Sequence, residues 1–430
     1  MGSTALIAVS FVAALGIGVP VAIALGIAAL TGLYLADMPL EYLAQNAYSA
    51  VDSFTVIAIP MFILAGALME RGQLTDRLID LSRAIVGRAP GGLATVTIMA
   101  CTLFAAISGS GPATTAAIGS IMIPAMVRDG YKRSFSCGVA ASAGGIGVVI
   151  PPSIPMIIYG VTAETSITAL FVAGVIPGLI LALALYAVAK VISHRRGYSS
   201  PAVEGARGPR IWAAFLAAKW SLLAPVVILG GIYTGVFTVT EASVAGVVYA
   251  LVIGFLVHRT LTFADLIDSL VATARIAGTV LIVLATGLVF GRILALYQVP
   301  QDVSGWLTQT FTDRTALILM IALLLLFIGM WMETITQIVI LTPLLLPAVV
   351  ATGMDPIQFG VMFVIACELG FQTPPLGVNL FVAGEIAGAK IEEVTQGVVP
   401  FVIAGTVVLL LVGFIPELSL WLPRELGYIR

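Results

Sequence analysis

Long runs without a charged residue occupy most of this chain. A helix needs about 20 apolar residues to cross the hydrocarbon core of a bilayer, and runs of this order recur from end to end. Several contain glycine and proline in mid-run, which membrane-embedded backbone tolerates only where the freed polar groups are satisfied inside the protein. The pattern predicts an all-α polytopic membrane protein. The runs are 1–36, 53–69, 89–127, 134–163, 165–189, 220–240, 242–257, 276–291, 315–332, 334–354, 356–367 with 369–384, and 394–416.

The first run, 1–36, is too long for one simple span. Pro20 either kinks a single helix there or divides the run into two short helices, since proline removes a backbone donor and crowds the preceding turn. The pattern alone leaves both alternatives open.

Composition supports the membrane assignment. Hydrophobic residues make up 60% of the 430 residues and charged residues only 10%, with a mean hydropathy of +1.11. A soluble chain of this length needs far more charge on its surface. The net charge of −2 and the presence of only four lysines argue against a nucleic-acid partner.

Loop charges give an orientation. The segment 191–219 contains several basic residues and a single acid, Glu204, so the positive-inside rule places it in the cytoplasm. It is also rich in glycine, serine and proline, which is typical of a linker. This segment therefore divides the chain into two halves.

The two halves repeat each other without a gap. Four prolines and three glycines of the first half recur in the second at one constant difference in residue number, called here the repeat offset. The charges that follow the first two equivalent prolines differ in sign: Arg128, Lys132 and Arg133 follow Pro124, whereas Asp355 follows Pro347. This predicts inverted-topology repeats, an architecture of secondary transporters. The pairs are Pro124 and Pro347, Pro151 and Pro374, Pro152 and Pro375, Pro177 and Pro400, Gly130 and Gly353, Gly147 and Gly370, and Gly174 and Gly397.

Each half has the same predicted plan. An amphipathic stretch (73–86, then 298–312) is followed by an apolar run interrupted at its middle (108–112, then 331–334), read as a re-entrant hairpin, although two complete spans remain possible. A helix broken by Pro-Pro comes next. The predicted organisation is 1–88 scaffold helices and arm, 89–190 first repeat of a transport domain, 191–219 linker, 220–314 second scaffold and arm, 315–416 second repeat, and 417–430 tail.

The broken helices suggest chemistry for both a cation and an anion. Unwound carbonyls beside Ser or Thr hydroxyls make a weak oxygen cage suited to Na⁺, and helix N-termini at the same breaks favour a carboxylate. The alternative is that proline and small residues only permit close helix packing. Two such segments in matching register favour the functional interpretation.

At these segments the sequence resembles the large membrane subunit of tripartite ATP-independent periplasmic (TRAP) transporters. The resemblance rests on residues 108–126 (SGSGPATTAAIGSIMIPAM), 146–160 (IGVVIPPSIPMIIYG) and 368–388 (ELGFQTPPLGVNLFVAGEIAG), with similar stretches at 18–26 and 59–69. It implies an elevator-type, sodium-driven secondary transporter in a bacterial inner membrane. It also implies a small TRAP membrane subunit and a periplasmic substrate-binding protein that delivers a small carboxylate, such as a C4-dicarboxylate or a sialic acid.

The resemblance also implies two sodium sites, each pairing a hairpin tip with a helix break. The first would use Ser108, Ser110, Gly147, Ile150 and Pro152, and the second Gly329, Gly370, Thr373 and Leu376. The two tips differ, since Trp331 and Glu333 stand where the first repeat has Ser108 and Ser110. Which hydroxyls bind the ion is therefore open.

Candidate substrate contacts are Ser153, Arg292 and Asn379. The guanidinium of Arg292 suits a carboxylate, although the side chain could equally extend to the membrane interface. Asn379 could instead form a hydrogen bond between helices. Glu333 and Glu368, at a tip and beside a break, either tune a sodium site or have a structural role.

Other classes of protein fit the sequence less well. An intramembrane serine enzyme lacks a partner histidine, because His194 and His258 lie in or beside charged loops. No nucleotide-binding G-x-x-x-x-G-K-[ST] motif occurs. A channel is disfavoured by the paired broken helices. A self-sufficient carboxylate symporter, coupled to sodium or protons, remains the closest alternative.

Overall fold

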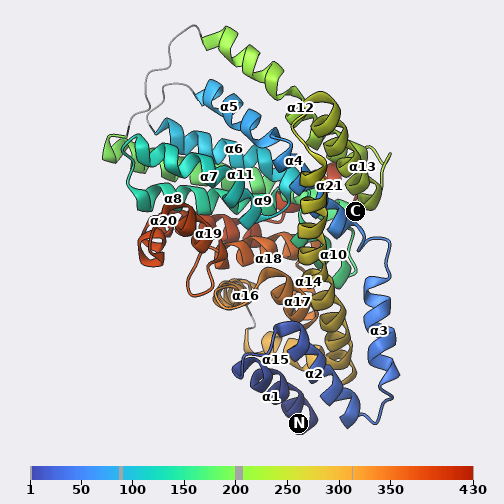
Figure 1. Ribbon diagram of the computed structural model, residues 1–430. Coiled ribbons are helices and arrows are strands. Elements are labelled where there is room, and N and C mark those ends of the chain that lie inside the picture. Colours follow the sequence, from blue (N-terminus) through green and yellow to red (C-terminus); the bar gives the residue numbers. More distant parts are fainter. Residues whose placement is uncertain (1, 87–90, 199–206, 312, 430) are drawn as a thin grey trace.

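The computed structural model describes residues 2–86, 91–198, 207–311 and 313–429, and these residues form helices without a strand (Figure 1). The helices are α1 (Gly2–Gly16), α2 (Val21–Leu35), α3 (Glu41–Val51), α4 (Ala58–Arg71), α5 (Leu74–Val86), α6 (Gly92–Ser108), α7 (Gly111–Arg128), α8 (Arg133–Gly144), α9 (Ile146–Val149), α10 (Ile154–Thr162), α11 (Ile167–Arg196), α12 (Arg207–Tyr233), α13 (Val239–Leu251), η1 (Val252–Val257), α14 (Phe263–Leu296), α15 (Val299–Thr310), α16 (Arg314–Gly329), α17 (Thr334–Ala351), α18 (Pro356–Gly370), α19 (Val378–Ala387), α20 (Ile391–Phe414) and α21 (Glu417–Glu425).

The predicted class, an all-α polytopic membrane protein, is confirmed. Six of the described helices are long and apolar enough to cross a membrane, and a seventh candidate is a pair bent by 43°, residues 133–149 with 154–162. That bent pair is the first of the two predicted broken helices. The six are 167–196, 209–233, 239–257, 263–296, 334–351 and 391–414.

The first apolar run forms two helices rather than one. α1 and α2, of 15 residues each, are separated by a turn at Gly18 and pack against each other. Pro20 caps α2 with extended backbone. At about 1.5 Å per residue each helix is shorter than the hydrocarbon core, so neither resembles an ordinary single span.

Helix boundaries confirm the internal repeat. α7 and α17 begin and end at positions related by the repeat offset. The first residues of α8 and α18 are related by the same offset. Both predicted interruptions separate helices, α6 from α7 and α16 from α17, and both Pro-Pro segments separate helices as well. Ser110 and Glu333 occupy the same register, and each caps the helix that follows with its own side-chain oxygen.

The two repeats differ in how their helices pack. α6 lies along α7, whereas α16 packs mainly on α18 while α17 packs on α14 and α15. The first amphipathic arm, α5, buries Leu74, Leu78 and Leu81 against neighbouring helices that include α6 and α12. Its apolar face therefore packs against protein and does not lie free in the membrane interface.

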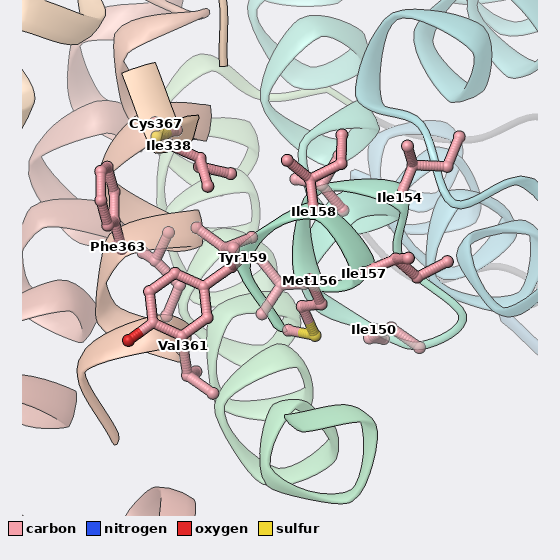
Figure 2. Packing of buried hydrophobic residues seen from close by; sticks show 14 of the residues in the cluster. Ile150, Ile154, Met156, Ile157, Ile158, Tyr159, Ile338, Val361, Phe363 and Cys367 are labelled. Atoms are coloured by element: carbon pink, nitrogen blue, oxygen red, sulfur yellow. The ribbon is translucent and has the colours of Figure 1, made fainter. Parts of the chain in front are cut away.

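An aromatic cluster joins the two repeats at their centre. Tyr159 on α10 is fully buried, and its hydroxyl donates to the carbonyl of Pro356 at the start of α18 (2.7 Å). Its ring packs edge-on against Phe359 and Phe363. Figure 2 shows the Tyr159 side chain directed from α10 toward Phe363 and Val361. This contact fixes the first broken helix against the second.

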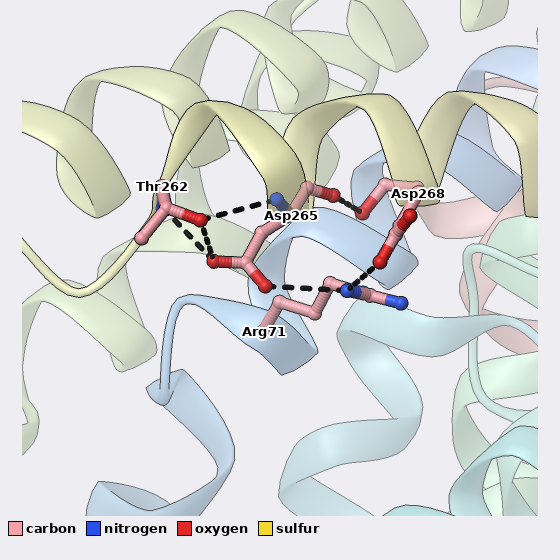
Figure 3. A network of polar contacts seen from close by, with 5 residues as sticks. Arg71, Thr262, Asp265 and Asp268 are labelled. Atoms are coloured by element: carbon pink, nitrogen blue, oxygen red, sulfur yellow. Dashed lines mark hydrogen bonds and ion pairs between the residues drawn. The ribbon is translucent and has the colours of Figure 1, made fainter.

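A polar network ties the helices outside the repeats. Arg71, the last residue of α4, forms ion pairs with Asp265 (3.2 Å) and Asp268 (3.3 Å) on α14. Asp265 also forms a reciprocal cap with Thr262 at the start of α14. Figure 3 shows these side chains converging on the first turns of α14. α4 and α14 are thereby held together at one end.

Helices extend into both ends of the predicted linker 191–219, because α11 continues to Arg196 and α12 begins at Arg207. Its middle, 199–206, and the predicted boundary at 88–89 lie outside the described residues.

Candidate functional site

A cavity of about 750 Å³ lies where the two helix interruptions meet the two broken helices. The N-terminal ends of α7, α10 and α17 line it, with one face of α14 and the start of α2 on the other side. The lining is mostly apolar. The residues are Pro20–Ile23, Ile63, Gly109–Pro112, Val148, Ile154, Pro155, Arg275, Ile276, Thr279, Val280, Ile282, Val283, Glu333–Thr336, Glu368 and Phe371.

Three oxygens cluster at the first interruption. The Ser108 and Thr114 hydroxyl oxygens lie 2.8 Å apart, and each lies within hydrogen-bonding distance of the Ser110 carbonyl oxygen (3.0 and 2.8 Å). Ser108 and Thr114 are buried. The Ser110 amide also donates to the Ser108 hydroxyl (3.2 Å), and the Thr114 amide donates to the Ser110 carbonyl (3.0 Å). A small cation could bind this cluster through the remaining lone pairs of its oxygens.

The first broken helix closes around this cluster. The Cβ of any residue at Gly109, which has a φ of +63°, would lie 2.7 Å from the Pro152 carbonyl oxygen. At Gly147 a Cβ would lie 2.5 Å from the Thr114 hydroxyl and 3.0 Å from the Ser110 carbonyl. The structure therefore brings Ser108, Ser110, Gly147 and Pro152 together as predicted. It places Ile150 against Gly178 instead.

The second interruption meets the second break through backbone. A Cβ at Gly370 would lie 2.6 Å from the Gly329 Cα, and the Leu376 amide donates to the Met330 carbonyl (3.0 Å). The side-chain oxygen of Gln337 would lie 3.3 Å from a Cβ at Gly329, and it is buried without a hydrogen-bond partner. An unsatisfied buried acceptor is costly, and this oxygen keeps both lone pairs available at the contact between Gly329 and Gly370.

Thr373 also belongs to this second cluster of predicted residues. Its amide donates to the Gly370 carbonyl (2.9 Å) and its hydroxyl to the Leu369 carbonyl (2.8 Å). The hydroxyl oxygen is thus occupied as a donor and keeps a lone pair for a cation. Gly329, Gly370, Thr373 and Leu376 are together, as the sequence predicted.

The cavity is suited to an anion. The N-termini of α7 and α10 face it through Gly111–Pro112 and Ile154–Pro155, and helix N-termini carry partial positive charge. The N-terminus of α17 is occupied by Glu333, whose carboxylate accepts from the amides of Ile335 (3.0 Å) and Thr336 (3.2 Å). The N-termini of α7 and α10 carry only neutral serine caps, Ser110 and Ser153, so their partial positive charge is not neutralised by an acid.

The cationic side chain at the cavity is Arg275 rather than the predicted Arg292. Arg275 lies on the exposed face of α14 and lines the cavity. Arg292, near the C-terminal end of α14 and absent from the lining, donates to the side-chain oxygen of Asn46 on α3. A charged side chain within the membrane is energetically costly. The cavity accounts for the position of Arg275, whereas the hydrogen bond to Asn46 accounts for that of Arg292.

Ser153 and Asn379 lie behind the cavity wall rather than in it. Ser153 is fully buried and caps α10, accepting from the Met156 amide (3.3 Å). The Asn379 amide donates to the Ala141 carbonyl on α8 (3.3 Å) and to the Glu368 carboxylate. The polar contacts of both residues are thus made within the protein, beside the two breaks.

Sequence reasoning missed Thr114, Gln337 and Arg275. The repeat contained the signal for the first two, because Gln337 is related to Thr114 by the same repeat offset as the paired prolines. Arg275 immediately precedes the charge-free run 276–291, so the sequence indicates a residue at the end of a membrane span.

Comparison with known proteins completes this description. Residues 8–418 match the family model of the tripartite ATP-independent periplasmic transporter, DctM component. The chain is 45% identical to the isethionate TRAP transporter permease DctMQ of Oleidesulfovibrio alaskensis over 94% of its own length and 64% of that relative's. It is 38% identical to the C4-dicarboxylate large permease DctM of Pseudomonas aeruginosa, covering 93% of both, and 37% identical to the sialic acid large permease SiaM of Vibrio cholerae, covering 96% of both.

Solved structures with the same fold are transporters too. The Alcanivorax borkumensis YdaH transporter superposes with a TM-score of 0.65 over 90% of this chain and 89% of its own, at 15% identity. The Neisseria gonorrhoeae MtrF protein gives a TM-score of 0.61 at 14% identity, over 87% of this chain and 84% of its own. At these identities the likeness concerns the fold.

Proposed function

Since this chain belongs to the DctM family of tripartite ATP-independent periplasmic transporters, a family of inner-membrane permeases, we propose that it imports a small carboxylate driven by a sodium gradient. The carboxylate would occupy the cavity between the two interruptions. The competing function, a symporter that works without a binding protein, has the same geometry and differs in its partners.

One observation carries the sodium proposal. Each of the two clusters joins an interruption to the neighbouring helix break through glycine contacts and holds side-chain oxygens beside them. These are the buried Ser108 and Thr114 in the first, and the buried Gln337 with the half-buried Thr373 in the second. Hydroxyl, amide and carbonyl oxygens are hard, neutral ligands, which suit an alkali cation bound weakly enough to leave again. The ion would fasten each interruption to its helix break.

The anion would be held by this chain's own dipoles and charge. The ends of α7 and α10 point at the cavity, and Arg275 faces it from α14. A guanidinium binds a carboxylate through two parallel hydrogen bonds. Glu333 and Glu368 line the same cavity, so the site would favour an anion that presents hydroxyl or other donor groups toward these two acids.

The proposed motion is an elevator. The repeats 89–190 and 315–416 would move as one body, since the Tyr159 cluster joins them. The scaffold 1–88 and 220–314 would stay fixed, since α14 packs on α2, α3 and α4. The cavity lies where α2 and α14 of the scaffold meet both repeats, which is where such a motion changes the access of a ligand.

Partners follow from the length of the relatives. The chain spans 64% of the isethionate permease DctMQ but 93% of the C4-dicarboxylate permease. We propose that a small membrane subunit works with this chain and corresponds to the part of DctMQ outside the region of similarity. A periplasmic binding protein would deliver the substrate.

Uptake by proteoliposomes tests the proposal. The chain, reconstituted with its small subunit and binding protein, should accumulate a C4-dicarboxylate or a sialic acid only with an inward sodium gradient, and isethionate serves as the competing substrate. Omitting the binding protein should abolish uptake. Undiminished uptake without it would establish the self-sufficient symporter, and uptake without a sodium gradient would exclude sodium coupling.

A further inference from the structure

A second cavity, of about 270 Å³, lies where the start of α8 and the end of α11 meet α20. It shares no lining residue with the cavity proposed for the substrate. Lys132 and Ser134 line it from the α8 side, Arg196 is the last residue of α11, and Pro400 belongs to α20. α8 and α20 are in close contact here, since a Cβ at Gly397 would collide with the Ser134 carbonyl.

Two basic side chains at this cavity lack an acidic partner. Lys132 and Arg196 are both exposed, and among the described residues neither forms an ion pair with an aspartate or a glutamate. Their neighbour Arg133 differs, because its guanidinium pairs with the carboxylate of Glu393 (3.7 Å). The cavity is therefore positively charged, and it suits an anion.

Aromatic side chains hold this region in place. The guanidinium of Arg196 lies over the ring of Phe135, 5.9 Å from its centre, and such contacts orient a cation. The Tyr198 hydroxyl accepts from the Lys132 amide (3.1 Å), and the Tyr198 ring packs against Phe135 (5.5 Å). α8 begins at this point without a side-chain cap, so the partial positive charge of its N-terminus adds to that of the two side chains.

This combination of groups favours a phosphate. A phosphate group offers several oxygens to different donors, and both the planar guanidinium of arginine and the point charge of lysine bind it. The remaining lining residues Phe135, Ile192 and Pro400 are apolar, so the cavity also accommodates the carbon atoms next to the phosphate in an ester.

Apolar surface beside the cavity indicates the source of the ester. On α20 the side chains of Val399, Ile403 and Val407 are 48%, 61% and 53% exposed, and residues at this spacing lie on one face of a helix. Val399 directly precedes Pro400 of the lining. Both α11 and α20 are long and apolar enough to cross a membrane. The apolar face of α20 would therefore contact acyl chains at the membrane edge of the cavity.

We propose that this cavity binds a phosphate ester, supplied by an anionic phospholipid of the cytoplasmic leaflet. The headgroup contacts Lys132 and Arg196 while its acyl chains lie along α20. The bound lipid joins α8 and α11 of the first repeat to α20 of the second. The choice of leaflet rests on the predicted orientation, in which the basic loops are cytoplasmic, and the binding itself does not depend on the proposed function.

Lipid binding by the full chain, delipidated in a neutral detergent, tests the inference. Titration with short-chain phosphatidylglycerol, followed by native mass spectrometry, should show one lipid bound more tightly than any other. Lys132→Gln and Arg196→Gln should each weaken this binding about fivefold, the equivalent of about 1 kcal/mol for one basic residue. Arg196→Lys should keep most of the affinity because it keeps the charge. Arg195→Gln, exposed but outside the lining, is the matched control and should bind as wild type does.

Competition by glycerol 1-phosphate identifies the source of the phosphate, and it needs only the wild-type protein if a variant fails to fold. This soluble ester should displace the lipid, with an affinity roughly tenfold lower or less because it lacks acyl chains. Equal affinity for the two compounds would keep the phosphate site and reject a lipid as its source. No competition, or the same loss of binding in Arg195→Gln as in Arg196→Gln, would overturn the inference. Neither result bears on sodium-driven uptake, which tests the proposed function separately.

Discussion

At the scale of single residues, the two proposed sodium clusters rest on very few side-chain oxygens. Ser108 and Thr114 serve the first, and Gln337 and Thr373 the second. Because the remaining ligands are backbone carbonyls, which substitution does not remove, each side chain can be tested separately. The two clusters also differ chemically, since a hydroxyl at 114 corresponds to an amide at 337.

Ser108→Ala should weaken sodium dependence without unfolding the protein. The substitution removes one oxygen and little volume, and the loss of one neutral ligand should cost about 1–2 kcal/mol by analogy with a hydrogen bond. Uptake should therefore need roughly 5- to 30-fold more sodium and partly recover when sodium is raised. Ser120→Ala, on the exposed side of α7, is the matched control. An unchanged sodium titration for Ser108→Ala would remove this hydroxyl from the site.

Gln337→Leu should have a similar effect through the second cluster. It removes the buried oxygen beside Gly329 and also the donor to the Leu325 carbonyl (2.8 Å). We expect a loss of sodium affinity of about the same size, together with a lower melting temperature. Gln396→Leu, at an exposed position on α20, should change neither. A stability loss with wild-type sodium affinity would make Gln337 a packing residue.

At the level of residues, the sequence indicates which positions lie together where backbone dictates the contact, and not where the contact depends on the direction of one side chain. Gly147, Gly329 and Gly370 follow from Pro-Pro breaks and repeat register, which a sequence displays. Arg292 was a reasonable candidate by composition, but its guanidinium meets Asn46 on α3, a helix far earlier in the chain. Periodicity within α14 carries no information about which face meets α3 and which meets the cavity.

At the scale of elements, the interruptions and breaks were predictable because proline and glycine mark them. The lengths of α7 and α17 and the starts of α8 and α18 follow the repeat offset. The packing of α16 and α17 on different partners was not predictable. The two repeats have equivalent apolar surfaces, and the sequence does not show which neighbouring helix each surface contacts. Pro20 likewise left one helix or two undecided, and contacts between α1 and α2 decided it.

Gly109→Ala should disable the first interruption. Alanine at a φ of +63° costs about 1–2 kcal/mol, and its Cβ would collide with the Pro152 carbonyl. Gly130→Ala is the matched control, since it has a φ of +84° but open space around its Cβ. We expect both to lower the melting temperature and only Gly109→Ala to lower sodium-driven uptake. Equal uptake for the two variants would show that the close contact with Pro152 has no functional role.

Arg71→Ala should change stability little. The side chains of Arg71, Asp265 and Asp268 are 38%, 31% and 65% exposed, and exposed ion pairs contribute about 0–1 kcal/mol. Thr262→Ala should cost more, about 1 kcal/mol, because it removes the cap of α14. Thermal unfolding in detergent compares the two. A larger loss for Arg71→Ala would mean that the α4–α14 contact depends on charge more than exposure suggests.

At the scale of the whole molecule, the repeat is established while its orientation in the membrane stays a prediction. The side of the membrane on which each loop lies came from loop charges alone, since Arg133 and Asp355 stand at equivalent starts of α8 and α18. The elevator motion and the division 1–88, 89–190, 191–219, 220–314, 315–416 and 417–430 are proposals of the same kind.

Side-specific labelling tests the orientation. Single cysteines at Arg133 and Arg207 should react with an impermeant reagent only from the cytoplasm, and one at Asp355 only from the periplasm, because positive loops stay inside. The three native cysteines, all buried, should remain unlabelled in the parent protein. Reaction of all three introduced cysteines from one side would contradict inverted repeats.

The contact between Gly145 and Glu368 concerns the relation between the two halves of the chain. Glu368 and Gly145 occupy equivalent positions of the two repeats, related by the repeat offset, and they touch each other. A dimer of two identical subunits would carry the same residue at both places, giving either two colliding carboxyl groups or none. Within one chain the two positions can differ, as Gly145 and Glu368 do, because each half can change without the other.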